Sequence, residues 1–240
     1  MSTMPESAPT AFSVPTGNAL PTAALRIPAE ALTFHGFNRW VTADLVPAGW
    51  RVARIRGELF VEMSPEEIQS HGQLKTEVIR SLATLVRARR LGRVYADRTL
   101  VTNEAADLAS EPDCTFVSHE ALLTGRVRWI PAESDQARFL SLAGSPDLVV
   151  ELVSKSSVVK DTQVLKDAYE AAGVKEYWLI DARREIMSIL IFSLAGTQFE
   201  PVLVSNGRWQ SPLFGDGFHL FREKDEFGYW EYTLETTGPK

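Results

Sequence analysis

The sequence is poor in cysteine, in long apolar runs and in excess basic charge, and each shortage excludes a class of protein. Cys114 is the only cysteine among 240 residues, so neither an internal disulfide nor a cysteine zinc cluster is possible. A reducing, cytoplasmic location is therefore predicted. No window approaches the roughly 18 apolar residues of a membrane span, and the first residues lack the pattern of a signal peptide. We expect no membrane partner.

Basic residues do not outnumber acidic ones, because 25 Lys and Arg stand against 31 Asp and Glu, for a formal net charge of -6. A polyanionic partner would therefore need a local basic patch or bound cations. What is present is an ordinary globular composition, 45% hydrophobic and 23% charged. Residues 1–28, rich in Ser, Thr, Ala and Pro, are predicted to be a disordered tail, and residues 29–240 a single domain.

One carboxylate, Glu151, stands inside the apolar run of residues 147–153. Burying an ionised Glu costs several kcal/mol unless it is paired or binds a metal, which makes Glu151 a site candidate. The alternative is a Glu on the wet face of a half-buried strand, which would also turn Val149 and Val153 outwards.

A helix is predicted after this strand, because apolar residues recur at helical spacing from Val164 to Ala172 and Gly173 provides a stop. A second apolar strand, residues 176–181, follows directly. Strand, helix and strand form a βαβ unit with parallel strands. Glu151 is then expected near the carboxyl end of its strand, with Lys166 on the next helix, at the edge where open α/β sheets place their sites.

Outside residues 147–181, the sequence predicts a helix and several strands joined by loops. A hairpin is expected over 51–55 and 59–63, and Ser64 is predicted to cap a helix that runs to about Arg90. His71 lies on or beside the apolar stripe of that helix, so a structural and a site role both stay open. The other expectations are a strand at 94–101, a loop at 105–110, a strand at 114–117, a surface excursion at 118–144, an antiparallel meander from 186 to 209 and an irregular aromatic segment at 214–240.

Two acids on neighbouring strands with a lysine nearby suit metal-assisted phosphodiester hydrolysis. Carboxylate oxygens are ligands for a hard ion such as Mg²⁺, and a lysine offsets developing charge. Asp113, Glu151 and Lys166 meet this requirement. Spacing alone is a weak signal, since such triples occur by chance in a chain of this size.

The order of motifs resembles the Uma2 family, also called DUF820, over roughly residues 32–222. The motifs are GELFVEMSP, His71 on the next helix, EPDCTFV, SPDLVVELVSKSS and AAGVKEYWLID. The resemblance implies an α/β, restriction-endonuclease-like fold of the PD-(D/E)xK nuclease superfamily, with a central mixed β-sheet flanked by helices and an antiparallel C-terminal meander.

By position, the resemblance implies Asp113 and Glu151 as the metal-binding acids and Lys166 as the catalytic lysine. The supporting residues that it implies are His71, Tyr169 and Glu58. Val153 stands where the superfamily pattern has lysine, so the lysine function is expected to have moved to Lys166 or to have been lost, with Lys155 as a second candidate.

The function implied is a Mg²⁺-dependent endonuclease acting on DNA, with Mn²⁺ as a second metal. The alternative is a catalytically silent domain that binds nucleic acid or a protein. Val153 and the acidic charge favour the alternative, and the joint presence of the two acids and Lys166 favours the enzyme. A homodimer is expected, because cutting both strands needs two sites and the C-terminal aromatics offer apolar surface. These aromatics, which alternatively close the protein's own core, are Phe214, Phe218, Phe221, Phe227, Tyr229 and Trp230.

Overall fold

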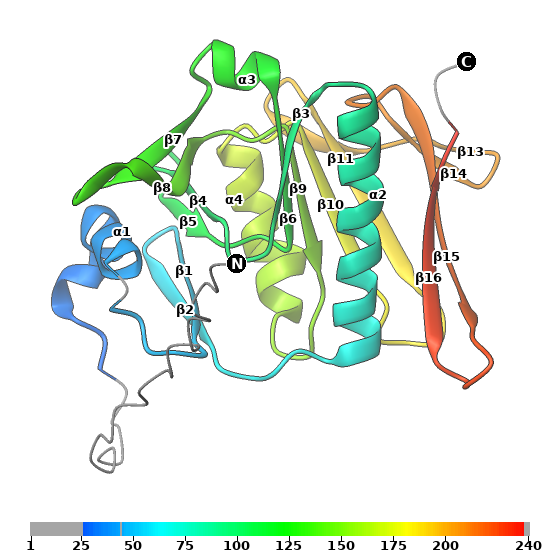
Figure 1. Ribbon diagram of the computed structural model, residues 1–240, viewed down its shortest axis with the longest axis horizontal. Helices are drawn as coiled ribbons and strands as arrows, with labels where there is room; N and C mark the ends of the chain where they lie inside the picture. Colours follow the sequence, from blue (N-terminus) through cyan, green and yellow to red (C-terminus); the bar gives the residue numbers. More distant parts are fainter. Residues whose placement is uncertain (1–25, 44, 238–240) are drawn as a thin grey trace, which may run out of the picture.

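The computed structural model describes residues 26–43 and 45–237, which form three β-sheets and a few helices (Figure 1). Of the predicted tail, residues 1–25 lie outside the described residues, whereas Ile27 packs against the core around Phe37 and Trp40. The short helices η1 (Ala29–Leu32) and α1 (Phe34–Thr42) follow, and the Thr33 side chain caps α1.

The central sheet has the order β12-β11-β10-β9-β6-β3. Its strands are β3 (Gly92–Ala96), β6 (Cys114–Ser118), β9 (Leu148–Leu152), β10 (Glu176–Asp181), β11 (Ser188–Ala195) and β12 (Gln198–Pro201). Strands β9 and β10 are parallel and are joined by η3 (Lys160–Leu165) and α4 (Lys166–Ala171), which confirms the predicted βαβ unit. Gly173 ends the helix with φ +73°, a conformation that glycine adopts without steric cost.

Helix α2 (Leu74–Ala88) covers one face of the central sheet and continues the π-helical turn η2 (Ile68–Gln73). Its predicted apolar stripe is confirmed as buried: Leu74, Val78, Leu82 and Leu85. The predicted cap at Ser64 is wrong, because the helix begins four residues later. The carboxylate of Glu67 accepts hydrogen bonds from the backbone N–H groups of Gln69 and Ser70, and a negative charge is favoured at this end of a helix.

An antiparallel C-terminal sheet packs beside α2 (Figure 1). It consists of β13 (Val204–Ser205), β14 (Arg208–Ser211), β15 (Asp216–Lys224) and β16 (Trp230–Thr236). The expectation of an irregular segment at 214–240 is therefore wrong. Phe214 and Phe218 fill the protein's own core, and the Phe218 ring lies 4.8 Å from Trp178, so these two residues offer no dimer surface. Phe227 and Tyr229 remain exposed.

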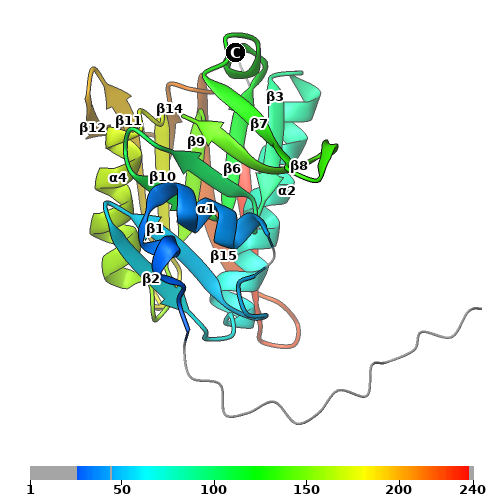
Figure 2. The same cartoon turned by 90° about the vertical axis from the view of Figure 1, so that its left-hand side faces the viewer.

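The first sheet, of order β2-β1-β5-β4-β8-β7, lies on the other side of the central sheet (Figure 2). Its strands are β1 (Arg51–Ile55), β2 (Glu58–Glu62), β4 (Leu100–Asn103), β5 (Leu108–Ser110), β7 (Val127–Ala132) and β8 (Asp135–Gly144). Helix α4 packs between the two sheets, because Ile55 and Leu108 of the first sheet and Val149 of the central sheet share one apolar cluster with Tyr169.

Three predictions for this region are wrong. The strand expected at 94–101 is two strands in different sheets, separated by a turn in which Arg98 has φ +68°. The expected loop at 105–110 contains β5, and the expected excursion at 118–144 contains α3 (His119–Leu123), β7 and β8.

The overall class is the predicted one, mixed α/β with a central mixed sheet and an antiparallel C-terminal sheet. Among the described residues, no helix combines the length and apolar character needed to cross a membrane.

Candidate active site

A cavity of about 710 Å³ opens where the carboxyl end of β9 meets the start of η2. Strand β1, the loops after β9 and β10, and the β15–β16 hairpin complete its wall. The predicted acids Asp113 and Glu151 both line it, together with His71. The structure therefore brings the two acids and the histidine together in one hollow.

Asp113 precedes β6, and the pairing of Cys114 with Val150 places it beside the carboxyl end of β9. Its side chain is buried, with 5% of the residue exposed. Oδ2 accepts a hydrogen bond of 2.8 Å from the backbone N–H of Leu152, and Oδ1 lies 2.9 Å from Nζ of Lys75. Both oxygens are thus held in place, Oδ2 by the strand that carries Glu151 and Oδ1 by a cation.

Glu151 is the buried carboxylate that its apolar surroundings predicted, with 6% of the residue exposed. The hydroxyl of Tyr169 donates a 2.7 Å hydrogen bond to Oε1, so the helix after β9 holds this acid. Burial raises the pKa of Glu151 well above its ordinary value, and the charges of Asp161 and Asp113 raise it further. A cation next to Glu151 would favour its ionised form.

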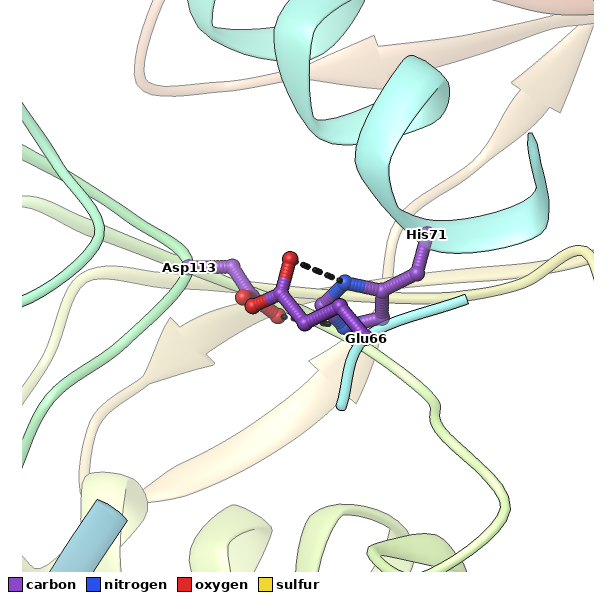
Figure 3. A group of neighbouring side chains, drawn as sticks. All are labelled: Glu66, His71 and Asp113. Atoms are coloured by element: carbon purple, nitrogen blue, oxygen red, sulfur yellow. Dashed lines mark ion pairs between the residues drawn. The ribbon is translucent and has the colours of Figure 1, made fainter. Parts of the chain in front are cut away.

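His71 is buried and faces this site, as Figure 3 shows. Its Nε2 lies 3.0 Å from the carbonyl oxygen of Leu152 and 3.6 Å from Oδ2 of Asp113. Its Nδ1 lies 3.4 Å from a carboxylate oxygen of Glu66. One ligand atom from each of Glu66, His71 and Asp113 falls within 4.8 Å of the others, a grouping that suits a metal ion.

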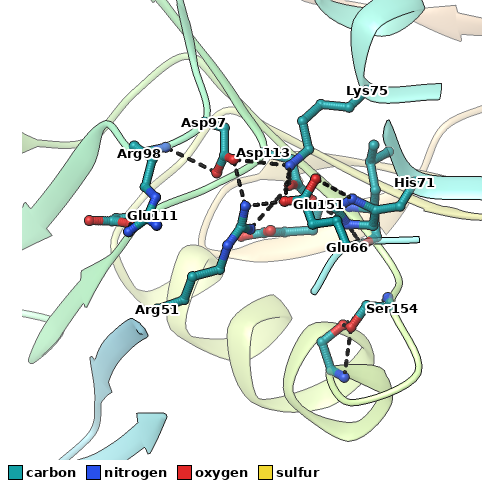
Figure 4. Close-up of polar contacts among 12 residues, drawn as sticks. Arg51, Glu66, His71, Lys75, Asp97, Arg98, Glu111, Asp113, Glu151 and Ser154 are labelled. Carbon is teal, nitrogen blue, oxygen red and sulfur yellow. Dashed lines mark hydrogen bonds and ion pairs between the residues drawn. The ribbon is translucent and has the colours of Figure 1, made fainter. Parts of the chain in front are cut away.

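Two further cations reach Asp113 from outside the predicted set (Figure 4). Nζ of Lys75 lies 2.7 Å from Glu66 and 3.1 Å from Asp97, and a guanidinium nitrogen of Arg51 lies 2.6 Å from Asp97. Burial acts to lower the pKa of Lys75, but the carboxylates of Asp113 and Glu66 outweigh burial and raise it. Lys75 is therefore a buried, charged lysine in direct contact with the first predicted acid.

A second pair, the half-buried Lys160 and the buried Asp161, lines the cavity at the start of the crossover helix. Nζ of Lys160 lies 2.6 Å from Glu62 and 3.7 Å from Oδ1 of Asp161. Burial raises the pKa of Asp161 to about 7, although the charge of Lys160 and a hydrogen bond from the Ser157 hydroxyl act in the opposite direction. This Oδ1 has no hydrogen-bond partner among the described residues.

The structure does not bring Lys166 to the site. Its Nζ lies 5.0 Å from the centre of the Phe192 ring and 6.0 Å from that of Phe199, where the ammonium is held by the electrons of the rings. Lys160, almost two helical turns earlier, is the lysine of this helix that lines the cavity. Glu58 is the exposed first residue of β2 and does not line the cavity either.

Sequence reasoning missed Lys75, Lys160, Glu66 and Arg51 as members of this site. One signal was available, because Lys75 lies four residues after His71 and therefore on the same side of the helix. The others had none, since a glutamate or lysine at the start of a helix, like an arginine at the end of a strand, usually faces solvent.

The fold and site define a mixed α/β protein with buried carboxylates and cations around one cavity. The chain belongs to the Uma2 family, because the family model described as "Putative restriction endonuclease" matches residues 36–221. Membership of this family indicates a nuclease.

Among solved structures, the chain is similar to the crystal structure of "a putative nuclease belonging to DUF820" from Anabaena variabilis. The identity is 16% over 68% of this chain and 83% of that one, with a TM-score of 0.48. No curated protein matches the chain.

Proposed function

We propose that the protein is a metal-dependent endonuclease that hydrolyses phosphodiester bonds in DNA. One observation carries the proposal: Asp113 and Glu151, from neighbouring strands, are buried side by side with His71 in one cavity. Family membership supports the hydrolysis of nucleic acid. Asp113 is paired with Lys75, whereas Glu151 forms no ion pair among the described residues, so its ionised form would be costly without a further cation.

The donor set fits a hard divalent ion. Carboxylate oxygens of Asp113 and Glu151 are the ligands that Mg²⁺ prefers, and Mn²⁺ also accepts the imidazole that His71 offers. When bound, the ion polarises a phosphate oxygen and lowers the pKa of a bound water. We propose Asp113 and Glu151 as the residues that hold it.

The neighbouring residues orient these two acids. The Tyr169 hydroxyl fixes Oε1 of Glu151, and the Leu152 N–H fixes Oδ2 of Asp113. The His71 ring contacts the carbonyl of Leu152, the last residue of β9, and is thereby held at the same end of this strand as the two acids. In place of Lys166, we propose Lys160 as the lysine that offsets the negative charge developing on the phosphate, because it lines the cavity.

The test is cleavage of supercoiled plasmid by the purified protein in Mg²⁺, in Mn²⁺ and in EDTA. We expect nicked and linear products with either metal and none in EDTA. Asp113→Asn and Glu151→Gln should each lower the rate by at least about 100-fold. Glu200→Gln removes one exposed carboxylate from β12 and serves as the matched control.

Calorimetric titration of Mg²⁺ distinguishes the enzyme from a catalytically silent binding domain. If the protein is a metal-dependent enzyme, the wild type should show heat of Mg²⁺ binding and Glu151→Ala should show none. A protein that binds DNA but neither binds Mg²⁺ nor cleaves would support the silent domain.

We also propose a homodimer, because cutting both strands of a duplex needs two sites. The exposed Phe227 and Tyr229 at the tip of the β15–β16 hairpin offer apolar surface for it. A monomer mass by light scattering at micromolar concentration would contradict the dimer.

A further inference from the structure

Two exposed cations stand at the mouth of the cavity, on the loops that follow the parallel strands β9 and β10. Lys155 is on the first loop and Arg184 on the second, and both line the cavity. Within residues 26–43 and 45–237, neither side chain forms an ion pair or a hydrogen bond. Their charges are therefore available to a ligand.

Two other arginines at the mouth of the cavity, Arg183 and Arg222, hold these loops in place. Arg183 donates hydrogen bonds of 2.9 and 2.7 Å to the Asp181 carboxylate and one of 3.3 Å to the Ser154 carbonyl, so it ties the two loops together. Arg222 of β15 donates to the carbonyls of Ala182, at 3.0 Å, and Glu185, at 2.8 Å. Lys155 and Arg184 thus project from loops that need little reordering on binding.

The charge changes sign between the depth of the cavity and the part of its mouth that the loops after β9 and β10 form. Asp113, Glu151 and Asp161 are buried inside, whereas Lys155 and Arg184 are exposed outside. Glu185 is the one acid in residues 153–159 and 182–187, so Lys155 and Arg184 leave a net positive charge on these two loops. In a chain of net charge -6, such a positive segment can offer a polyanion the local attraction that the chain as a whole does not.

We infer that Lys155 and Arg184 form a phosphate-binding rim, which holds backbone phosphates of a nucleic-acid strand next to the one that enters the cavity. This inference rests on the proposed nuclease function and adds a substrate class to it: an extended strand rather than a mononucleotide. Lysine binds phosphate as a point charge, and arginine binds two phosphate oxygens at once.

The test is the salt dependence of binding to fluorescein-labelled oligonucleotides, measured by fluorescence anisotropy. All proteins carry Glu151→Gln, which keeps the probe intact in Mg²⁺. The probes are a single strand and a duplex of DNA and matched RNA, from about 50 to about 200 mM salt. The rim variant is Lys155→Ala/Arg184→Ala. The matched control is Arg128→Ala/Arg138→Ala, which removes the same charge from β7 and β8, outside the cavity.

Loss of two phosphate contacts should reduce the slope of log affinity against log salt by about 1.4 for a single strand and about 1.8 for a duplex. The conservative variant Lys155→Arg/Arg184→Lys should keep the wild-type slope, and the control should change it by less than about 0.5. An unchanged slope in the rim variant would overturn the inference, as would an equal loss in the control or no oligonucleotide binding at low salt.

The rim and the proposed function fail in different ways. If the rim variant shows the smaller salt slope but the wild type cleaves no DNA, the phosphate-binding rim is supported and the endonuclease is contradicted. If the wild type cleaves and the rim variant keeps its slope, the rim alone is overturned. A slope change seen with RNA and not with DNA supports the rim and contradicts DNA as the substrate.

Discussion

Asp161→Asn should make the stability of the protein less dependent on pH. The Asp161 carboxyl is 2% exposed, and its pKa rises from the ordinary 3.8 to about 7, chiefly through burial. In the unfolded chain this group ionises near its ordinary pKa. Between the two values the native state binds more protons than the unfolded state, so the free energy of unfolding falls as pH rises and is constant above about pH 7.

The magnitude follows from the two pKa values. Each pH unit in this window corresponds to about 1.4 kcal/mol, so the full shift lowers stability by about 4 kcal/mol above pH 7. From about pH 5 to about pH 8 the wild type should lose about 3 kcal/mol relative to Asp161→Asn. The amide still accepts the Ser157 hydrogen bond, but its N–H₂ faces Lys160, which costs the variant about 1 kcal/mol at every pH.

Urea unfolding in EDTA, followed by tryptophan fluorescence at several pH values, measures this difference directly. Asp167→Asn is the matched control, because that side chain is 55% exposed on the same helix and should leave the pH dependence unchanged. Parallel curves for Asp161→Asn and the wild type from about pH 5 to about pH 8 would refute the raised pKa of Asp161.

Three further results are expected. Lys160→Ala should lower Mg²⁺-dependent cleavage by about 10- to 100-fold while Lys166→Ala changes it less than about threefold, and a reversed order would contradict the placement of Lys160. Glu176→Ala should lower the free energy of unfolding by about 2–4 kcal/mol in urea, because three donors lose their buried acceptor, and a loss below about 1 kcal/mol would contradict this. Gly144→Ala should lower the melting temperature by several degrees, since its φ is +124° and a Cβ would overlap the Arg126 carbonyl, whereas Gly207→Ala, in an open turn, should lower it less.

The centre of the fold could be predicted from the sequence because its signals are local. The strands around Glu151 and Ile180 are buried on both faces and read as continuous apolar runs, and Gly173 marks the end of the helix between them. The strands at the periphery could not be predicted in this way. Strand β8 is exposed over its first half, and β16 alternates polar and apolar residues, so both resemble loops.

For the site, the acids could be predicted and the lysines could not. Glu151 stands out because a carboxylate in an apolar strand has a large energetic cost wherever the strand packs. Asp113 was predicted from its place in the motif EPDCTFV. Lys75 and Lys160 become site residues only through tertiary contacts with Asp113 and Glu62. The spacing of a lysine along a helix does not specify which layer covers it, which is why Lys166 was placed incorrectly.

The wall of the cavity is assembled from segments that are far apart in the chain. Its lining includes Arg51 of β1, Arg222 of β15 and Trp230 of β16. During synthesis from the N-terminus, the ribosome releases β15 and β16 after every other strand described here. Until then Asp113 and Glu151 lack one wall of their cavity, so a nascent chain that ends before Trp230 has an incomplete site.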